Sequence, residues 1–306
     1  MTIMSSPELS IIILSFNTKD ITLQCLDSIY KSMAVREGLK PSPTFEIIVW
    51  DNASHDGSVE ALETYAKTHD NLVFIPHKEN IGFGRGNNRA VEKAKGKYIL
   101  CLNSDTIILD NAIGKMLEFY KENEDYIHFL GPKIFNKDMT DQPSAAPFYT
   151  PPVVFGSLFL RGDLWGLTRY SPDKLTKVDW LHGACFLTKK EYYEKLKGFD
   201  ESIFMYMEEV DLQYRASKLG YTSYFYPEAQ IIHLGSASSG GKTFPILQVY
   251  KGFLWFYKRH YGQFSIFLLK RMLQLKALFA YLLGRLTGDQ YLINTYAEAY
   301  KLVDLV

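Results

Sequence analysis

The most informative stretch of this 306-residue chain is Tyr98-Ile99-Leu100-Cys101-Leu102-Asn103-Ser104-Asp105. A short apolar run, typical of a buried strand, ends here in two polar side chains and a carboxylate. In open α/β sheets, ligands bind beyond the carboxyl ends of the strands, where an acid can hold a divalent cation against a phosphorylated ligand. A turn or helix-cap role for Asp105 is the simpler alternative, and this stretch alone leaves both open.

The residues before this stretch alternate between strand and helix patterns. Continuous apolar runs predict buried strands at residues 9–15, 45–50 and 72–75, in addition to 98–102. Apolar residues at helical spacing predict helices at 20–33, 59–67 and 86–95. This alternation predicts βαβ units and therefore a Rossmann-like α/β fold, with a mostly parallel central sheet and flanking helices.

The second half of the chain has a less regular pattern. Strands are predicted at residues 178–188, 199–207 and 221–234, with a helix at 210–219. Residues 138–152 are rich in Pro, Ser and Thr, which predicts an exposed loop.

Composition limits the kind of partner and the compartment. Lys and Arg number 34, as do Asp and Glu, so no net charge favours nucleic acid. Cys25, Cys101 and Cys185 each lie in an apolar context, as expected for buried thiols in a reducing compartment. The N-terminus lacks a signal-peptide pattern, and no uncharged apolar run reaches transmembrane length. A cytoplasmic protein is therefore expected.

The C-terminal part is basic and amphipathic. Residues 246–288 contain seven Lys or Arg and no Asp or Glu. On a helical wheel one face carries Leu268, Met272, Leu275, Phe279 and Leu282, and the opposite face carries Lys270, Gln274, Tyr281 and Arg285. Such a helix suits adsorption to an anionic membrane surface, such as the inner face of the cell membrane, and packing on the rest of the chain is an equal alternative.

Polar residues also follow the other predicted strands. Ser15 and Asn17 end the first strand, and Asp51 ends the second, where it can accept a hydrogen bond from a nucleotide base. Ordinary turn chemistry is the alternative at both places. Glycines at alternate positions from Gly82 allow close backbone approach to a ligand, and Arg85 among them is suited to phosphate. Lys242, in a later Gly-rich loop without P-loop spacing, could also meet phosphate.

Acids cluster at Glu208, Glu209 and Asp211, beside aromatic residues. Partial burial and mutual repulsion would raise the pKa of such a carboxylate towards that of a useful base. Acids that begin a helix are the alternative. His233 is near the end of a predicted strand, and a single histidine there is compatible with either a metal-binding or a structural role.

Taken together, these segments resemble the family 2 glycosyltransferases of GT-A fold, and most of all bacterial rhamnosyltransferase-like members. The matching segments occur in the family's order within residues 9–236, at 10–17, 47–54, 80–88, 102–105, 182–184, 198–201, 204–212 and 233–236.

The resemblance implies roles for particular residues. Glu209 would be the catalytic base, and Asp105 and His233 would bind Mg²⁺ or Mn²⁺. The residues implied to bind the nucleotide sugar are Ser15, Asn17, Asp51, Gly82, Arg85, Asn87, Asn103 and Asp105. Those implied on the acceptor side are Trp180, His182 and Glu208. Asn103 stands where the family has the first acid of its metal-binding motif, and Glu209 stands where the family has Asp.

The resemblance also implies domains and an activity. Residues 1–240 would form the catalytic domain, with a nucleotide-sugar half over about 1–125 and an acceptor half over about 126–240, followed by a basic helical segment at 241–306. The implied reaction is an inverting transfer of a sugar, rhamnose from dTDP-rhamnose as the best guess, to a hydroxyl of a saccharide or lipid-linked saccharide in cell-surface polysaccharide synthesis. The alternatives are a sugar nucleotidyltransferase and a non-catalytic, membrane-associated nucleotide-sugar binder.

Overall fold

The fold is described from a computed structural model over residues 6–34, 44–235 and 243–305. The strands are β1 (Leu9–Ser15), β2 (Phe45–Asn52), β3 (Leu72–His77), β4 (Tyr98–Asn103), β5 (Thr106–Ile108), β6 (Phe129–Phe135), β7 (Asp141–Gln142), β8 (Ala145–Ala146), β9 (Thr176–Val178), β10 (Trp180–Leu181), β11 (Cys185–Lys189) and β12 (Ser223–His233). The helices are α1 (Lys19–Met33), α2 (Ser58–Ala66), α3 (Phe83–Val91), α4 (Ala112–Glu122), α5 (Pro151–Phe159), the short 3-10 helix η1 (Gly162–Trp165), α6 (Lys190–Lys195), α7 (Glu208–Lys218), α8 (Thr243–His260), α9 (Gln263–Thr287) and α10 (Gln290–Leu305).

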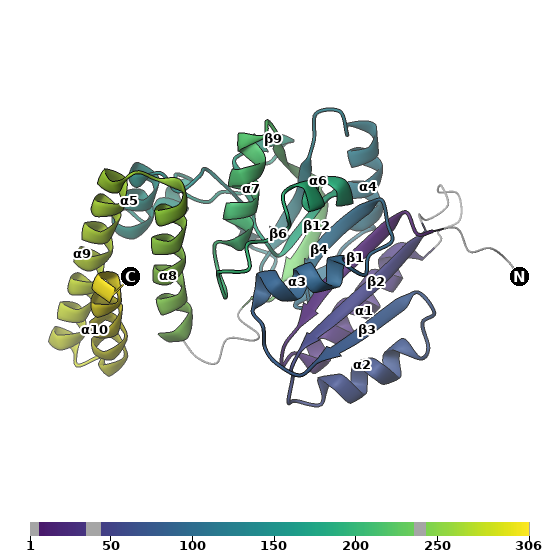
Figure 1. The fold of residues 1–306 in the computed structure, drawn as a ribbon, viewed down its shortest axis with the longest axis horizontal. Helices are drawn as coiled ribbons and strands as arrows, with labels where there is room; N and C mark the ends of the chain where they lie inside the picture. The colour runs from purple at the N-terminus through teal and green to yellow at the C-terminus, as the bar shows by residue number, and fades with distance from the viewer. Residues whose placement is uncertain (1–5, 35–43, 236–242, 306) are drawn as a thin grey trace, which may run out of the picture.

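The main sheet runs in the order β3-β2-β1-β4-β11-β6-β12-β5, with helices on both faces (Figure 1). The pairs among β3, β2, β1 and β4 are all parallel, which confirms the α/β prediction for the first half. The register aligns Ser15 with Asp51, and Leu14 with Asn103. The polar strand ends found in the sequence therefore meet at one edge of the sheet.

Two buried clusters cover the two faces of the sheet. Because side chains alternate along a strand, Ile11 and Ile13 of β1 pack with α1, α2 and α4, whereas Ile12 packs with α3, α6 and α7. A strand buried on both faces in this way explains the continuous apolar run of β1.

Three predictions for the second half are wrong. Residues 199–207 form turns, because their apolar side chains pack in different directions: Phe199 packs against Phe83 of α3, whereas Ile203 and Met207 belong to the cluster of the C-terminal helices. The strand predicted at 178–188 is divided into β9, β10 and β11. The loop predicted at 138–152 contains β7 and β8, with Ala145 and Ala146 fully buried.

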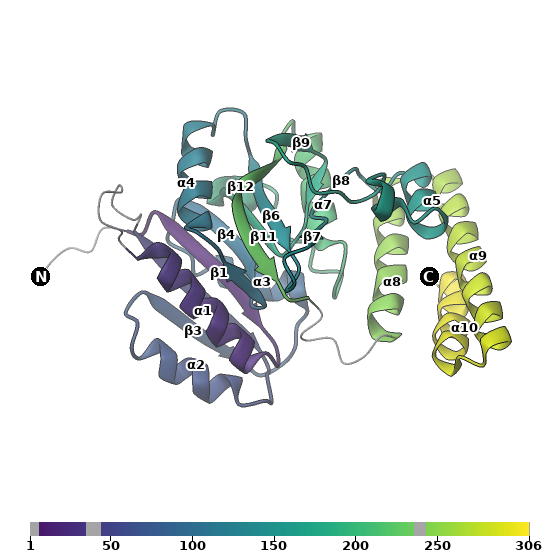
Figure 2. The same ribbon diagram turned by 180° about the vertical axis from the view of Figure 1, so that it is seen from behind.

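The three C-terminal helices form a layer beside the sheet (Figures 1 and 2). The end of α8 is fixed to α7 by His260, whose Nε2 lies 2.7 Å from a carboxylate oxygen of the fully buried Asp211. Arg259 pairs with Asp200, and Trp255 Nε1 donates to Ser202 Oγ at 2.9 Å. In the described part of the chain, no helix is long and apolar enough to cross a membrane.

Helix α9 uses a different face for packing from the one highlighted by the helical wheel. Its buried side chains include Leu269, Leu273 and Ala277. Gln274, placed on the polar face by the wheel, is buried and donates to Asp304 Oδ1 at 2.8 Å. Much of the apolar face of the wheel is therefore left exposed to solvent.

Helix α3 is positioned by the amide of Asn88. Its Nδ2 donates to the Phe199 carbonyl at 2.9 Å, while its Oδ1 accepts from Phe199 N at 3.0 Å and from the Tyr193 hydroxyl at 2.7 Å. Gly198 makes room for this contact, since a Cβ there would lie 2.4 Å from Asn88 Oδ1. One buried side chain thus joins α3 to the turn segment that leads to α7.

We expect Asn88→Ala to lower the free energy of unfolding by about 3 kcal/mol, because several buried groups lose their hydrogen-bond partner. Asn294→Ala, at an exposed position of α10, is the control and should change the value by less than about 0.5 kcal/mol. Denaturant unfolding followed by circular dichroism measures both. Equal stability of the two variants would contradict the proposed role of Asn88.

Candidate active site

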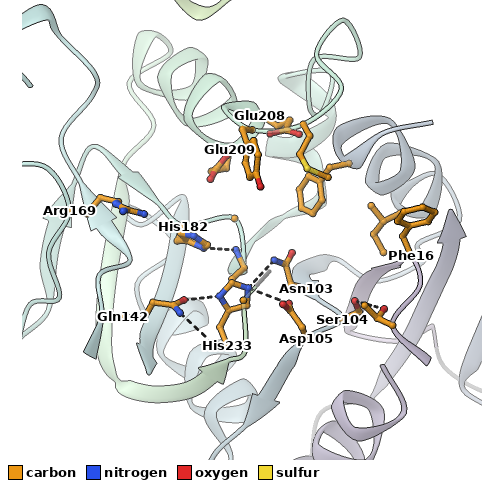
Figure 3. A pocket seen from close by; sticks show the side chains of 18 of the residues that line it. Phe16, Asn103, Ser104, Asp105, Gln142, Arg169, His182, Glu208, Glu209 and His233 are labelled. Carbon is orange, nitrogen blue, oxygen red and sulfur yellow. Dashed lines mark hydrogen bonds and ion pairs between the residues drawn. The ribbon is translucent and has the colours of Figure 1, made fainter. Parts of the chain in front are cut away.

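A cavity of about 1000 Å³ lies at the polar edge of the sheet. Its wall includes residues from the ends of β1, β4 and β12, from the start of α7 and from η1. Glu208 and Glu209 lie across this cavity from Asp105 and His233 (Figure 3). The segments that the sequence suggested for chemistry therefore converge on one site.

Asp105 and His233 form the centre of one side of the cavity. Asp105 Oδ1 lies 3.2 Å from His233 Nε2, and both side chains are about nine-tenths buried. The two residues are brought together by the pairing of β12 with β5, in which His233 aligns with Thr106. Asn103 Nδ2 lies 3.4 Å from the same nitrogen of His233.

The orientation of His233 is fixed by Gln142. The Gln142 Nε2 group donates to the His233 carbonyl at 3.3 Å. The other amide atom of Gln142, Oε1, lies 2.7 Å from His233 Nδ1. Because an amide oxygen can only accept, Nδ1 carries the proton of this hydrogen bond. In the neutral ring, Nε2 then presents a lone pair towards Asp105. Two acceptors at this distance need a proton or a cation between them, and a carboxylate with an oriented imidazole is a suitable partial ligand set for a divalent metal.

Glu208 and Glu209 begin α7 after an unusual turn. Tyr206 and Met207 both have positive φ, at 69° and 77°, so the chain reverses sharply before the helix. Gln213 then fixes the helix, since its Oε1 accepts from Leu181 N and its Nε2 donates to the Leu181 carbonyl, each at 2.9 Å. The two acids are thereby held beside the segment that follows β10.

The two acids differ in environment. Glu208 is 2% exposed, and its Oε1 has no hydrogen-bond partner among the described residues. Burial raises the pKa of Glu208 well above its ordinary value, and the charge of Glu209 raises it further. Burial also raises the pKa of Glu209, but backbone hydrogen bonds, including one to Gly183, and the charge of Arg169 oppose this increase. The surroundings of Glu209 therefore stabilise a carboxylate, whereas those of Glu208 favour the neutral acid.

His182 and Gly183 complete the wall next to Glu209. Burial lowers the pKa of His182 to about 3, and the nearby His233 and Arg169 act in the same direction. The ring is therefore neutral, and its Nδ1 accepts from Ala184 N at 3.1 Å. A Cβ at Gly183 would lie 3.4 Å from the carboxyl carbon of Glu209, so this backbone segment packs closely against the acid.

Several lining residues were not identified from the sequence. Gln142 lies in the segment predicted to be an exposed loop. Arg169 and Asp163 line the cavity near the acids and form an ion pair, with Arg169 Nε 3.0 Å from Asp163 Oδ2. No local pattern marks these residues, because η1 and the segment after it contain neither a strand end nor a recognisable motif.

Ser15, Asn17 and Asp51 lie at the ends of β1 and β2 and hold the two loops together. Ser15 is fully buried, and its hydroxyl lies 3.3 Å from Thr22 Oγ1. Asn17 Oδ1 accepts from His55 N at 2.8 Å. Asp51 is also fully buried and accepts from the backbone N and hydroxyl of Ser54, at 2.8 and 2.6 Å. The Asp51 carboxylate thus forms the hydrogen bonds of its own turn. The neighbouring residues Phe16 and Asn52 line the cavity.

Gly82, Arg85 and Asn87 lie at the start of α3. Gly82 has a φ of 90°, and a Cβ there would lie 2.7 Å from the Phe204 carbonyl oxygen. Arg85 turns to Glu201, donating to its carbonyl at 2.8 Å, and Asn87 is buried and donates to the Phe83 carbonyl at 2.9 Å. These residues therefore position the helix. Lys242 lies outside the described residues.

Trp180 lies in the core beneath the C-terminal helices rather than at the cavity surface. It is 3% exposed, and its Nε1 donates to the Pro147 carbonyl at 2.9 Å.

The sequence profile of "Glycosyl transferase family 2" matches residues 10–213, more than half of the chain. N-acetylglucosaminyl-diphospho-decaprenol L-rhamnosyltransferase of Mycobacterium tuberculosis is 28% identical over 214 residues, covering 63% of this chain and 68% of that protein. Poly(ribitol-phosphate) beta-glucosyltransferase of Bacillus spizizenii is 36% identical over 118 residues, covering 38% of this chain and 18% of that protein.

Two solved structures share the fold. The mannosyltransferase PcManGT from Pyrobaculum calidifontis, in complex with GDP-Man and Mn²⁺, has a TM-score of 0.56 at 16% identity and covers 99% of this chain and 74% of that one. GalNAc-T7 with UDP, GalNAc and Mn²⁺ has a TM-score of 0.57 at 15% identity, covering 83% and 50%. The chain belongs to glycosyl transferase family 2, has the GT-A fold and is a glycosyltransferase.

Proposed function

We propose that the protein transfers a sugar, with inversion, from a nucleoside diphosphate donor to a hydroxyl of a saccharide or lipid-linked saccharide. The supporting observation is the arrangement of one cavity, with Asp105 and His233 on one side and Glu209 on the other. A relative named for rhamnose transfer to a diphospho-decaprenol saccharide supports rhamnose, from dTDP-rhamnose, and a lipid-linked acceptor.

The donor diphosphate would lie on the side of Asp105 and His233. A divalent cation bound by these residues, Mg²⁺ or Mn²⁺, would supply positive charge to the leaving diphosphate. The cation in the two related structures is Mn²⁺. Asn103 contributes a neutral amide in place of a second carboxylate, so we expect weak metal binding in the absence of nucleotide. The base would lie near Phe16 and Asn52, at the ends of β1 and β2.

Glu209 would act as the general base. It would take the proton of the acceptor hydroxyl as that oxygen attacks the anomeric carbon from the side opposite the leaving group. Glu208, kept protonated by burial, has a carboxyl that can donate a hydrogen bond to a sugar hydroxyl. Neutral His182 lies beside this acceptor region.

Glu209→Gln should reduce sugar transfer by about a thousandfold, because the amide cannot accept the proton. Donor affinity should stay within about twofold, since the change preserves shape. Transfer is measured with a radiolabelled nucleotide sugar, after a thermal-stabilisation screen has identified the donor. Glu191→Gln, at an exposed position of α6, is the control. Wild-type transfer by Glu209→Gln would reject Glu209 as the base.

Asp105→Asn should weaken nucleotide binding in the presence of Mn²⁺ by at least about tenfold, because the metal loses its charged ligand. Calorimetric titration of nucleoside diphosphates with Mn²⁺ and with EDTA separates this loss from metal-independent binding. Exposed Asp125→Asn should behave as wild type. Identical Mn²⁺-dependent affinities for Asp105→Asn and wild type would exclude the metal role.

Arg169→Gln should move the acidic limb of the pH profile of kcat/KM to higher pH, by about one pH unit. The direction follows because the Arg169 charge lowers the pKa of Glu209, and removing it keeps the base protonated to a higher pH. Arg169→Lys should restore most of the shift, and Lys174→Gln, at an exposed position nearby, should leave the profile unchanged. A limb that does not move in Arg169→Gln would contradict this coupling.

A further inference from the structure

Exposed apolar side chains gather on one face of α9. Six of them are 41–85% exposed: Phe267, Leu278, Phe279, Leu282, Leu283 and Leu286. They follow helical spacing on the side opposite the packed residues Leu269, Leu273 and Ala277. An exposed apolar stripe of this length indicates an interaction surface.

The stripe continues onto α5 and η1. The rings of Phe159 in α5 and Phe279 in α9 lie 6.5 Å apart, and the two helices are neighbours in Figure 2. Beyond α5, Leu164 and Trp165 of η1 are 72% and 75% exposed. We refer to the six exposed side chains of α9, together with Phe159 of α5 and Leu164 and Trp165 of η1, as the apolar face.

The charged residues of α9 are all positive. They are Lys270, Arg271, Lys276 and Arg285, and the helix contains no Asp or Glu. Arg271 lies over the ring of exposed Phe267, with 5.3 Å between guanidinium carbon and ring centroid, and Arg285 donates to the Tyr281 hydroxyl at 3.1 Å. Cations that flank aromatic and aliphatic side chains complement anionic lipid headgroups above an apolar layer. A symmetric dimer through this stripe would instead place like charges near one another.

The apolar face also reaches the active site. Leu164 belongs both to this face and to the wall of the cavity, where its neighbours are Asp163 and Arg169. A ligand that enters the cavity over η1 would thus pass directly from the apolar face to the side that holds Glu209. This continuity relates the surface to the acceptor rather than to the nucleotide.

We infer that the apolar face lies on an anionic bilayer, and that η1 is the edge at which the cavity opens to a lipid-linked acceptor held in that bilayer. The second part rests on the proposed function. The face would then hold the enzyme at the membrane while the donor enters from the aqueous side.

The first test is cosedimentation of the full chain with phosphatidylcholine vesicles containing 30 mol % phosphatidylglycerol. The triple variant Leu282→Ser, Leu283→Ser, Leu286→Ser should bind at least tenfold more weakly than wild type. A matched control changes three exposed apolar residues elsewhere, Val73→Ser, Met139→Ser and Leu219→Ser, and should bind as wild type. Arg271→Glu should reduce binding to the anionic vesicles. Unchanged binding of the triple variant, or a wild-type dimer in solution that the triple variant abolishes, would overturn the inference.

The second test places η1 at the membrane. In a Trp255→Phe background, brominated lipids in the vesicles should quench the fluorescence of Trp165, and the further change Trp165→Phe should remove most of the quenching, because the remaining Trp50 and Trp180 are buried. Quenching that persists in Trp165→Phe would reject η1 as the membrane edge. Glu209→Gln should bind vesicles as wild type does, so a failure of the proposed catalysis and a failure of membrane binding give different results.

Discussion

The pairing of β12 with β5 is the constraint on which the candidate site depends. It aligns His233 with Thr106, and the Asp105 carbonyl accepts from Leu234 N at 2.9 Å. A carboxylate and an imidazole that are far apart in the sequence are thereby held 3.2 Å apart. Gln142 then orients the imidazole through both of its amide atoms. The ligand set is thus prepared by backbone pairing and a second layer of hydrogen bonds, rather than by the residue types alone.

The first half of the fold could be predicted from sequence because its central strands β1, β2 and β4 are buried on both faces, and each is a nearly continuous apolar run. The polar residues at 103–105 marked the correct sheet edge for the same reason. Residues 199–207 looked like another strand, but Phe199 packs against α3 whereas Ile203 and Met207 pack with the C-terminal helices, and periodicity does not separate a strand from such a turn segment. Gln142 in β7 and Arg169 after η1 could not be found, because tertiary folding brings them to the cavity and no local sequence pattern marks them.

The C-terminal helices also show that a sequence pattern does not determine tertiary packing. The helical wheel of α9 correctly grouped apolar residues, but it could not tell which side would pack. Leu269, Leu273 and Ala277 pack against the protein, and Gln274 is buried by its bond to Asp304. Helices α10 and α8 cover the packed side of α9, so the larger apolar side chains on its other side remain exposed to solvent. Amphipathic pattern thus predicts that a helix has two faces, and only tertiary contacts decide which face is free.

The two glutamates at the start of α7 illustrate how burial affects the ionisation of an acid. Two adjacent glutamates at one helix start cannot both ionise easily, because each charge raises the other's pKa. Glu208 is the more buried and stays protonated, whereas Glu209 receives backbone hydrogen bonds and the charge of Arg169. Gly183 packs closely against the Glu209 side chain, and its backbone is one of the groups that hydrogen-bond to the carboxylate. The left-handed turn at Tyr206 and Met207 sets the direction from which the carboxylate enters.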